Sequence, residues 1–194
     1  HMPAGTHHVG SPMETMKETC LNCHDDAGIL KANVKRTLER KEELMETAMN
    51  NLGKAHLDAA KAWEVGATEK EMADSLQDIR HGQWRWDYSI ASHGSFFHAP
   101  EETLRLLSSA NNIAQDARIK LAKVLAKHGA ADFVAPDFST KEKAQKLAGV
   151  PLKKLVEEKK AFKKGLLKDW EKAAIKEGKL DPKIKKGMSD NTSY

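Results

Sequence analysis

The sequence predicts an all-α fold with long helices and little or no sheet. Apolar residues recur every three or four positions over several long segments, helix start and stop signals bound those segments, and no β-branched stretch alternates apolar and polar residues. With 194 residues, the chain is long enough for one well-packed domain or two small ones. No apolar run approaches the roughly 20 residues that cross a bilayer, which excludes a membrane-embedded protein.

Three long helices are predicted in the first two thirds of the chain. The first covers residues 29–65, where the apolar stripe is interrupted by Lys, Arg and Glu. A capping box of Thr68 and Glu71 begins the second. The third runs from Pro100 to Gly129, because proline suits a first helical turn and the acidic residues after it face the positive end of the helix dipole.

Two further helices are predicted in the last third. Ser139 and Glu142 form a second capping box before a short helix that ends at Gly149. A last helix of about 27 residues and about 40 Å begins at Pro151 and ends at Gly178, before a disordered tail. That length is large for this domain, so we expect its apolar stripe to pack against a second copy of the protein. The stripe consists of Leu152, Leu155, Val156, Phe162, Leu166, Trp170 and Ile175.

The basic charge is concentrated near the C-terminus. Residues 141–187 hold 16 Lys and 7 acidic residues but no Arg, and no base-reading motif accompanies them. A solvated or partner-facing helix surface explains this composition, and we expect no nucleic-acid partner. The N-terminal residues lack the pattern of a signal peptide, so we expect the chain to begin already processed or truncated.

The two cysteines lie within four residues, so they cannot form a disulfide framework. Cys20-Leu21-Asn22-Cys23-His24 is the attachment sequence for a c-type haem, because two thiols at this spacing reach the two vinyl groups and the next histidine binds the iron. A thioredoxin-like redox pair is one alternative, but it requires a βαβ context. Half of a zinc site is another, and it requires a second ligand pair.

A six-coordinate haem needs a second axial ligand. The chain has nine histidines, which is unusually many, and each alone is more often a surface residue than a ligand. Residues 81–100 concentrate His, Gly and aromatic residues, as expected where a chain packs against a porphyrin, although an aromatic core corner is the alternative. The candidates are His7, His8, His56, His81, His93, His98 and His128.

Several motifs in order resemble one family. HGQWRWDYSIASHGSFFHAPEETLRL at 81–106, CLNCH at 20–24, THHVGSP at 6–12, GATEKEM at 66–72 and STKEKAQKLAG at 139–149 closely resemble the C-terminal part of the ammonia-forming, pentahaem cytochrome c nitrite reductases. The resemblance covers nearly the whole chain. It implies long helices packed around covalently attached haem c, with its iron.

The resemblance also implies a set of ligands. Cys20, Cys23 and His24 match the fifth attachment motif, so His24 would be the proximal iron ligand of that haem. His7 matches the histidine that reaches the second haem, and His98 matches the distal ligand of the fourth. Two of the three histidines would therefore serve haems whose cysteines lie outside this chain.

Other residues near the motifs have less specific matches. His93 matches a residue that we expect beside a ligand without binding iron, and His8 replaces His7 if the register shifts by one. Residues 1–3 match the end of the family's fourth motif, which would make His1 a proximal ligand. A cloning scar or an omitted loop is the alternative, because the spacing from His1 to His7 is shorter than expected.

The resemblance implies an oxidoreductase that reduces nitrite to ammonia with six electrons as an intact protein. No catalytic residue is expected in this chain, because the family's catalytic haem and its calcium site lie upstream. We expect a haem-attachment segment at 1–28, a helical haem scaffold at 29–138 and basic helices with a tail at 139–194, all parts of one larger domain. A periplasmic location, a homodimer and a quinol-linked or cytochrome electron donor are also implied.

Two rival hypotheses share the haem motif. A single-haem electron-transfer domain without catalytic activity would ligate its one haem with two residues of this chain. A multihaem enzyme acting on hydroxylamine or sulfur oxyanions would follow the same haem logic, but the segment rich in His and aromatic residues disfavours it.

Overall fold

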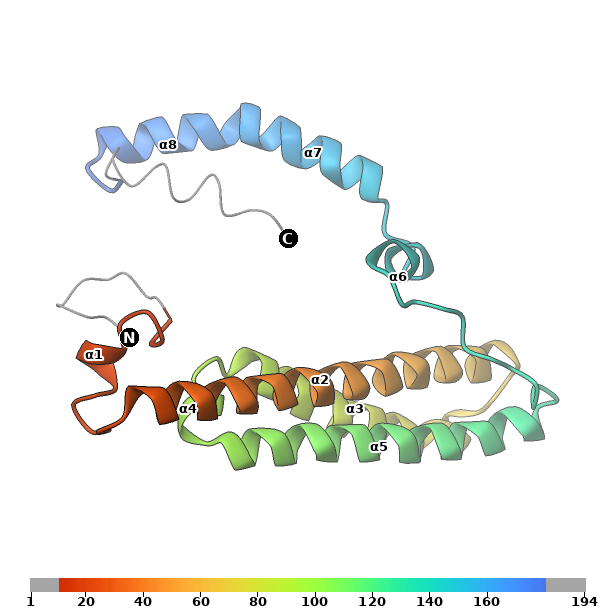
Figure 1. Cartoon of the computed structure of the whole chain (residues 1–194). Coiled ribbons are helices and arrows are strands. Elements are labelled where there is room, and N and C mark those ends of the chain that lie inside the picture. The colour runs from red at the N-terminus through yellow and green to blue at the C-terminus, as the bar shows by residue number, and fades with distance from the viewer. Residues whose placement is uncertain (1–10, 181–194) are drawn as a thin grey trace. The chain divides into compact units, whose positions relative to one another are not determined.

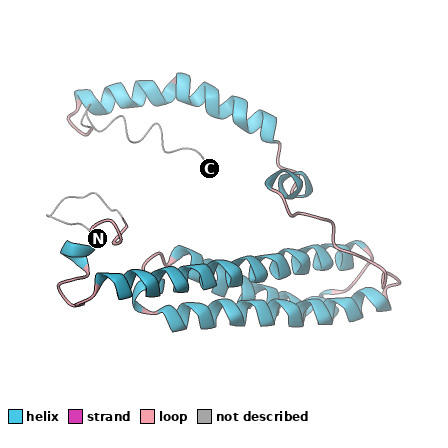
Figure 2. Ribbon diagram, viewed as in Figure 1, coloured by secondary structure: helices cyan, strands magenta, loops and turns pink. Residues whose placement is uncertain are grey.

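The computed structural model describes residues 11–180 and contains helices but no strand in that range (Figures 1 and 2). The all-α prediction is confirmed. The chain divides into two compact units, His1–Pro136 and Asp137–Tyr194. The three-part division expected from the sequence stays a prediction. No helix among the described residues is long and apolar enough to cross a membrane.

The first unit is built on three long helices: α2 (Ala27–Glu64), α3 (Glu69–Ala91) and α5 (Pro100–Lys127). They pack against one another, with α3 antiparallel to the other two (Figure 1). Apolar residues at helical spacings on these helices meet in one core, although Ile29, Met49 and Trp63 of α2 remain exposed. One continuous cluster of this core consists of Ala55, Ala59, Ala62, Ala67, Met72, Ile79, Ala117, Leu121 and Leu125.

Gly82 marks the closest approach within the bundle. A Cβ atom at Gly82 would lie 3.1 Å from Leu52 Cδ2 and 3.3 Å from the Ala110 carbonyl oxygen. Such distances are tighter than ordinary van der Waals contact, so a Cβ atom here would require the neighbouring atoms of α2 and α5 to shift by a few tenths of an ångström. The glycine therefore sets the spacing of the three helices.

The predicted helix signals act as expected at both connections of the bundle. Thr68 and Glu71 form the capping box that begins α3. Gly66 and Gly129 follow the ends of α2 and α5 and adopt positive φ values of 90° and 75°. Residues with a Cβ atom rarely adopt this conformation, which explains why both helices end at glycine.

Polar contacts between α2 and α5 fix how the two helices align. The Arg118 Nε atom donates to Asp58 Oδ2 over 2.9 Å, and the same guanidinium reaches Asn51 Oδ1 at 3.3 Å. Asn51 in turn donates to Asn111 Oδ1 over 2.8 Å. Only 10% of the Asp58 side chain is exposed, so its charge depends on Arg118 for compensation.

The second unit contains α6 (Lys141–Leu147), α7 (Leu152–Lys164) and α8 (Leu166–Lys176). Two predictions about it are wrong in detail. Thr140, and not Ser139, caps α6 by accepting a hydrogen bond from the Lys143 amide. The single helix predicted from Pro151 to Gly178 is interrupted at Gly165, whose φ of −107° and ψ of −97° are not helical. Glycine tolerates this conformation, so the break lies where a side chain is missing.

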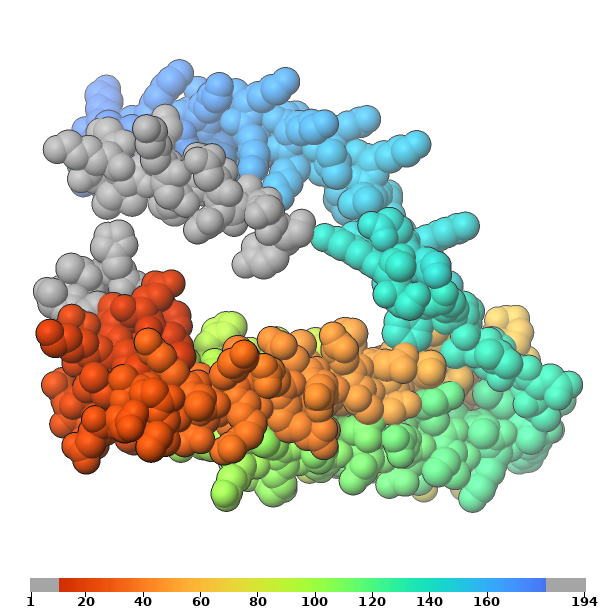
Figure 3. All heavy atoms as spheres, in the orientation of Figure 1, coloured from red at the N-terminus to blue at the C-terminus, as the bar shows by residue number. Residues whose placement is uncertain are grey.

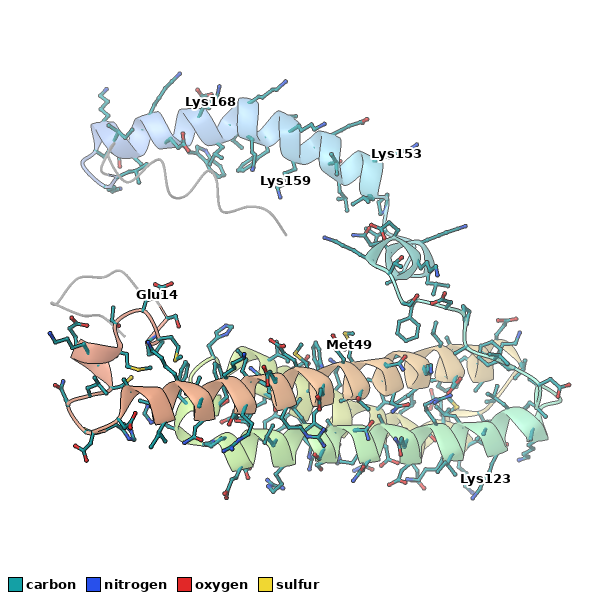
Figure 4. The ribbon with its side chains drawn as sticks, viewed as in Figure 1. Glu14, Met49, Lys123, Lys153, Lys159 and Lys168 are labelled. Carbon is teal, nitrogen blue, oxygen red and sulfur yellow. The ribbon has the colours of Figure 1, made fainter. Side chains whose placement is uncertain are left out.

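The apolar side chains of α7 and α8 remain largely uncovered. Phe162 and Trp170 are 40% and 57% exposed, and their rings meet edge to face across the break with centroids 5.6 Å apart. Lysines such as Lys153, Lys159 and Lys168 project from the same two helices (Figure 4). The expected packing of this stripe against a second copy stays a prediction.

Glu71 joins the start of α3 to the end of α5. Its carboxylate accepts hydrogen bonds from the Thr68 amide at 2.8 Å and from Lys127, and it lies 3.2 Å from His128 Nε2. These partners, with Lys127 first, hold the pKa of Glu71 well below its ordinary value near 4.5. A depressed carboxyl pKa stabilises the folded state above that ordinary value and ceases to do so as the pH falls.

We therefore expect Glu71→Gln to lower the stability of the protein at pH 7 and to lose less stability than the parent on acidification below about pH 4.5. Urea denaturation at pH 7 and pH 3 measures both effects. Glu69→Gln is the matched control, because Glu69 is an exposed acid in the same first turn. Equal stability differences from the parent at both pH values would contradict the prediction.

Candidate haem-attachment site

The attachment motif forms a tight turn after the short helix α1 (Met16–Thr19). The Cys20 amide donates to the Met16 carbonyl oxygen over 2.8 Å and so ends that helix. The amides of Cys23 and His24 then both donate to the Cys20 carbonyl oxygen, at 3.1 Å and 3.0 Å. Because both bonds converge on one carbonyl, the backbone between the two cysteines is folded back on itself.

Both thiols are free, Cys20 being half-buried and Cys23 exposed. The Cys20 sulfur lies 3.4 Å from Thr19 Oγ1, and that hydroxyl also donates to the Thr15 carbonyl oxygen over 2.7 Å. His24 is exposed, so its ring is accessible to a ligand. Two accessible thiols and an adjacent accessible imidazole on one turn fit the covalent attachment of a haem and ligation of its iron.

The turn is tied directly to the start of α2. Asp26 caps this helix, and its Oδ1 accepts hydrogen bonds from the amides of Gly28 at 2.7 Å and Ile29 at 2.9 Å. Such a cap satisfies amides that would otherwise lack partners at the first helical turn. His24 therefore lies two residues before Asp26, the capped start of α2.

His98 lies at the end of α4 (Ser95–His98), a four-residue helix that contacts α2 and α5. Its side chain is exposed and lines an open pocket of about 580 Å³. The other residues lining this pocket are Ala99, Pro100, Glu101, Glu102 and Arg105. His93 is exposed as well, and His7, His8 and residues 1–3 lie outside the described residues.

The remaining candidate histidines are distributed over the bundle. His128 contacts Glu71 at the end of α5, which gives it a structural role, whereas His56 and His81 are exposed on α2 and α3. Within residues 11–180, no three His, Cys, Asp or Glu side chains gather into a metal cluster. Among these described residues, His24 and His98 therefore do not share a cluster of such side chains.

The aromatic residues of α3 are divided between the core and the surface. Trp86 packs inward and donates its indole hydrogen to the Met45 carbonyl oxygen over 3.0 Å. Trp84 and Tyr88 stack with centroids 5.5 Å apart and remain 61% and 49% exposed. This exposed pair presents a flat apolar surface of the kind that packs against another flat group.

Two buried residues beside α4 were not predicted from the sequence as part of a candidate site. Lys41 is 8% exposed, and its Nζ lies 4.9 Å from the centroid of the Phe96 ring. Burial lowers the pKa of this lysine, because the charged form loses hydration. Thr103 is 2% exposed and faces the same segment. Periodicity could have identified both, since each occupies a polar position on the buried stripe of its helix.

A helical chain with this thiol pair and adjacent imidazole has the features of a c-type cytochrome. The family model described as cytochrome c552 matches residues 1–181. The chain is similar to cytochrome c-552 from Desulfotalea psychrophila, Aliarcobacter butzleri and Maridesulfovibrio salexigens, with 58%, 53% and 55% identity. Each match covers 97% of this chain but only 37% or 38% of the relative.

The chain therefore belongs to the cytochrome c552 family. Membership of this family of c-type cytochromes implies covalently bound haem c with its iron. The chain spans well under half the length of the relatives that it matches.

Removal of the α2 cap tests how firmly the attachment turn is held. We expect Asp26→Ala to lower the free energy of unfolding by about 0.5–2 kcal/mol, because two amides lose their acceptor. Asp25→Ala removes the same charge from the neighbouring exposed position and serves as the control. Urea denaturation measures both, and equal losses in the two variants would mean that charge alone, without the cap, stabilises the turn.

Proposed function

We propose that the chain is the C-terminal part of an ammonia-forming cytochrome c nitrite reductase. One observation supports it above the others: free thiols of Cys20 and Cys23 and the exposed ring of His24 share one hydrogen-bonded turn. In this proposal the cysteines attach one haem c and His24 binds its iron. Family membership and the fraction of each relative that the chain covers support the assignment to a larger multihaem protein.

His98 and His7 are proposed to bind the irons of haems attached outside this chain. For His98, the support comes from its distance from the attachment turn. Phe96 of the same short helix lies over Lys41, and Lys41 is 14 residues, or about 21 Å, along α2 from its first residue, Ala27. His24 precedes that first residue, so one iron is poorly placed to be bound by both histidines. For His7, the support is the family resemblance alone.

This arrangement favours the multihaem enzyme over the single-haem electron-transfer domain. A bound haem supplies reversible one-electron chemistry at its iron, which a six-electron reduction of nitrite requires repeatedly. The chain's own residues would hold the thiols on one turn and orient the imidazoles. The upstream part of the intact enzyme would supply the catalytic haem and the calcium site.

The wider setting belongs to the same proposal. Nitrite is the substrate of the intact enzyme, electrons arrive from a quinol-linked or cytochrome donor, and the enzyme works in the periplasm as a homodimer. Covalent haem attachment supports an exported protein of this class. The exposed stripe of α7 and α8, which includes Phe162 and Trp170, supports the dimer.

Covalent attachment is tested first. We expect this chain, produced with haem-maturation machinery, to keep a haem stain on denaturing gels and to gain the mass of one haem, because both thiols are free. Cys20→Ala together with Cys23→Ala removes the stain. Asn22→Ala, which changes the residue between the thiols, is the control that keeps it. A mass equal to that of the bare polypeptide contradicts the proposal.

The activity is tested in the full-length protein. With reduced viologen as electron donor, we expect nitrite to be converted to ammonium by the full-length protein and not above background by the 194-residue chain. The reason is that the proposed catalytic haem lies upstream. Rapid ammonium formation by the 194-residue chain alone would show that the active site has been assigned to the wrong part of the enzyme.

The subunit contact is tested by sedimentation of the full-length protein. We expect Phe162→Glu and Trp170→Glu to shift the dimer towards the monomer, because a carboxylate buried in an apolar interface loses its hydration. Ile119→Glu on α5 is the matched control, since Ile119 is as exposed as Trp170, at 57%. An unchanged dimer in both stripe variants would exclude these side chains from the interface.

A further inference from the structure

His98 is carried by an element too short to maintain its own shape. α4 has four residues, and its N-cap, Gly94, provides no side-chain hydrogen bond. Isolated helices of this length are unstable, because few backbone bonds offset the cost of nucleation. The direction of the His98 ring therefore depends on what packs against this segment.

The Thr103 hydroxyl contacts the backbone or side chains on both sides of His98. Its Oγ1 lies 2.9 Å from Ser95 Oγ and 3.0 Å from the Ala99 carbonyl oxygen, so one proton is shared between two acceptors. Ser95 Oγ donates onward to the Ser92 carbonyl oxygen over 2.8 Å. One buried hydroxyl therefore links the residues before His98 to the residue after it.

A second contact holds the other side of the segment. The Lys41 ammonium lies over the Phe96 ring at 4.9 Å from its centroid, and no carboxylate pairs with it among the described residues. A cation over an aromatic face is most favourable where water is excluded, as it is for a side chain that is almost fully buried. α4 is therefore held by α5 through Thr103 and by α2 through Lys41.

We propose that Thr103 is a positioning residue for His98, with Lys41 supporting the same segment through Phe96. Thr103 holds the Ser95 hydroxyl before His98 and the Ala99 carbonyl oxygen after it, so that the imidazole is directed before it meets an iron. This inference rests on the proposed role of His98 as an axial ligand. It assigns to Thr103 a role in ligation that does not require contact with the haem.

A purely structural role for Thr103 makes a different prediction. If the hydroxyl only stabilised the fold, its loss would lower the midpoint of thermal unfolding and leave every folded molecule with normal iron ligation. If it positions His98, its loss raises the fraction of folded molecules in which one haem lacks its sixth ligand. The spin state of the iron distinguishes the two, because a haem with an open position is high-spin or binds carbon monoxide when reduced.

The experiment uses the full-length enzyme with its complete set of haems. Thr103→Val removes the hydroxyl and keeps the shape, Thr103→Ser keeps the hydroxyl, and His98→Ala removes the ligand. We expect His98→Ala to gain one high-spin haem per chain and Thr103→Val to gain a fraction at the same haem. That fraction should exceed the Thr103→Ser value by about five-fold, the effect of losing one buried hydrogen bond.

Two results would overturn the inference, and they differ from each other. If His98→Ala gains the high-spin haem but Thr103→Val matches Thr103→Ser, the positioning role is wrong and the ligand role stands. If His98→Ala leaves all haems as in the parent, the ligand role is wrong, and the positioning role is wrong with it.

Milder variants keep the test decisive if Thr103→Val does not retain its haems. Ser95→Ala removes the acceptor on the half-buried side of the contact, and Lys41→Met removes the charge over Phe96 while keeping an apolar stem. If the high-spin haem fraction of Ser95→Ala exceeds that of Thr103→Ser, the inference is supported. We also expect Lys41→Met to show a higher high-spin fraction than Thr103→Ser. If the high-spin fraction of Ser95→Ala equals that of Thr103→Ser, the positioning role of Thr103 is wrong.

Discussion

The close packing of small side chains between α2, α3 and α5 is the constraint on which the first unit depends. Several alanines on α2 and α5 are completely buried, and at Gly82 of α3 a Cβ atom would lie in tight contact with Leu52 and Ala110. Small residues bring helix axes close together, which increases dispersion contacts over a long seam while each side chain buries little apolar area. In the space-filling view, atoms of α2 and α5 lie directly against each other on the visible face of the bundle (Figure 3). The short element α4 gains its position from this bundle, because it contacts α2 and α5 and is too short to be stable alone.

The sequence was informative at several helix ends where a local interaction decides the structure, although it assigned the cap of α6 to Ser139 and not to Thr140. Thr68 with Glu71 and Pro100 begin helices, and the glycines at 66 and 129 end them, because capping and positive φ depend on a few neighbouring residues. The break at Gly165 was missed because a single glycine within an apolar period is tolerated in many helices. α4 was missed for a related reason, since its shape is imposed by α2 and α5.

The same distinction holds for the candidate site. Cys20, Cys23 and His24 are predicted from spacing alone, because covalent attachment of a haem requires that spacing along the chain. Thr103 and Lys41 act across the gap between helices, and no spacing along the chain connects Thr103 to Ser95 or Lys41 to Phe96. A polar residue on an otherwise apolar stripe was the available signal, although it identifies a buried group without naming its partner.

Because α2 and α5 run parallel, the segments that precede them both lie at the same end of the bundle. The attachment turn precedes α2 and α4 precedes α5, so both candidate ligand segments lie towards the N-terminal ends of parallel helices (Figure 1). Contact between Lys41 and Phe96 nevertheless places α4 about four helical turns along α2 from its start. A rigid helix between two ligand segments fixes their separation, and electron transfer between cofactors depends steeply on such distances. A long, alanine-packed helix is therefore suited to hold two candidate ligand segments apart, which a flexible connection of the same length could not do.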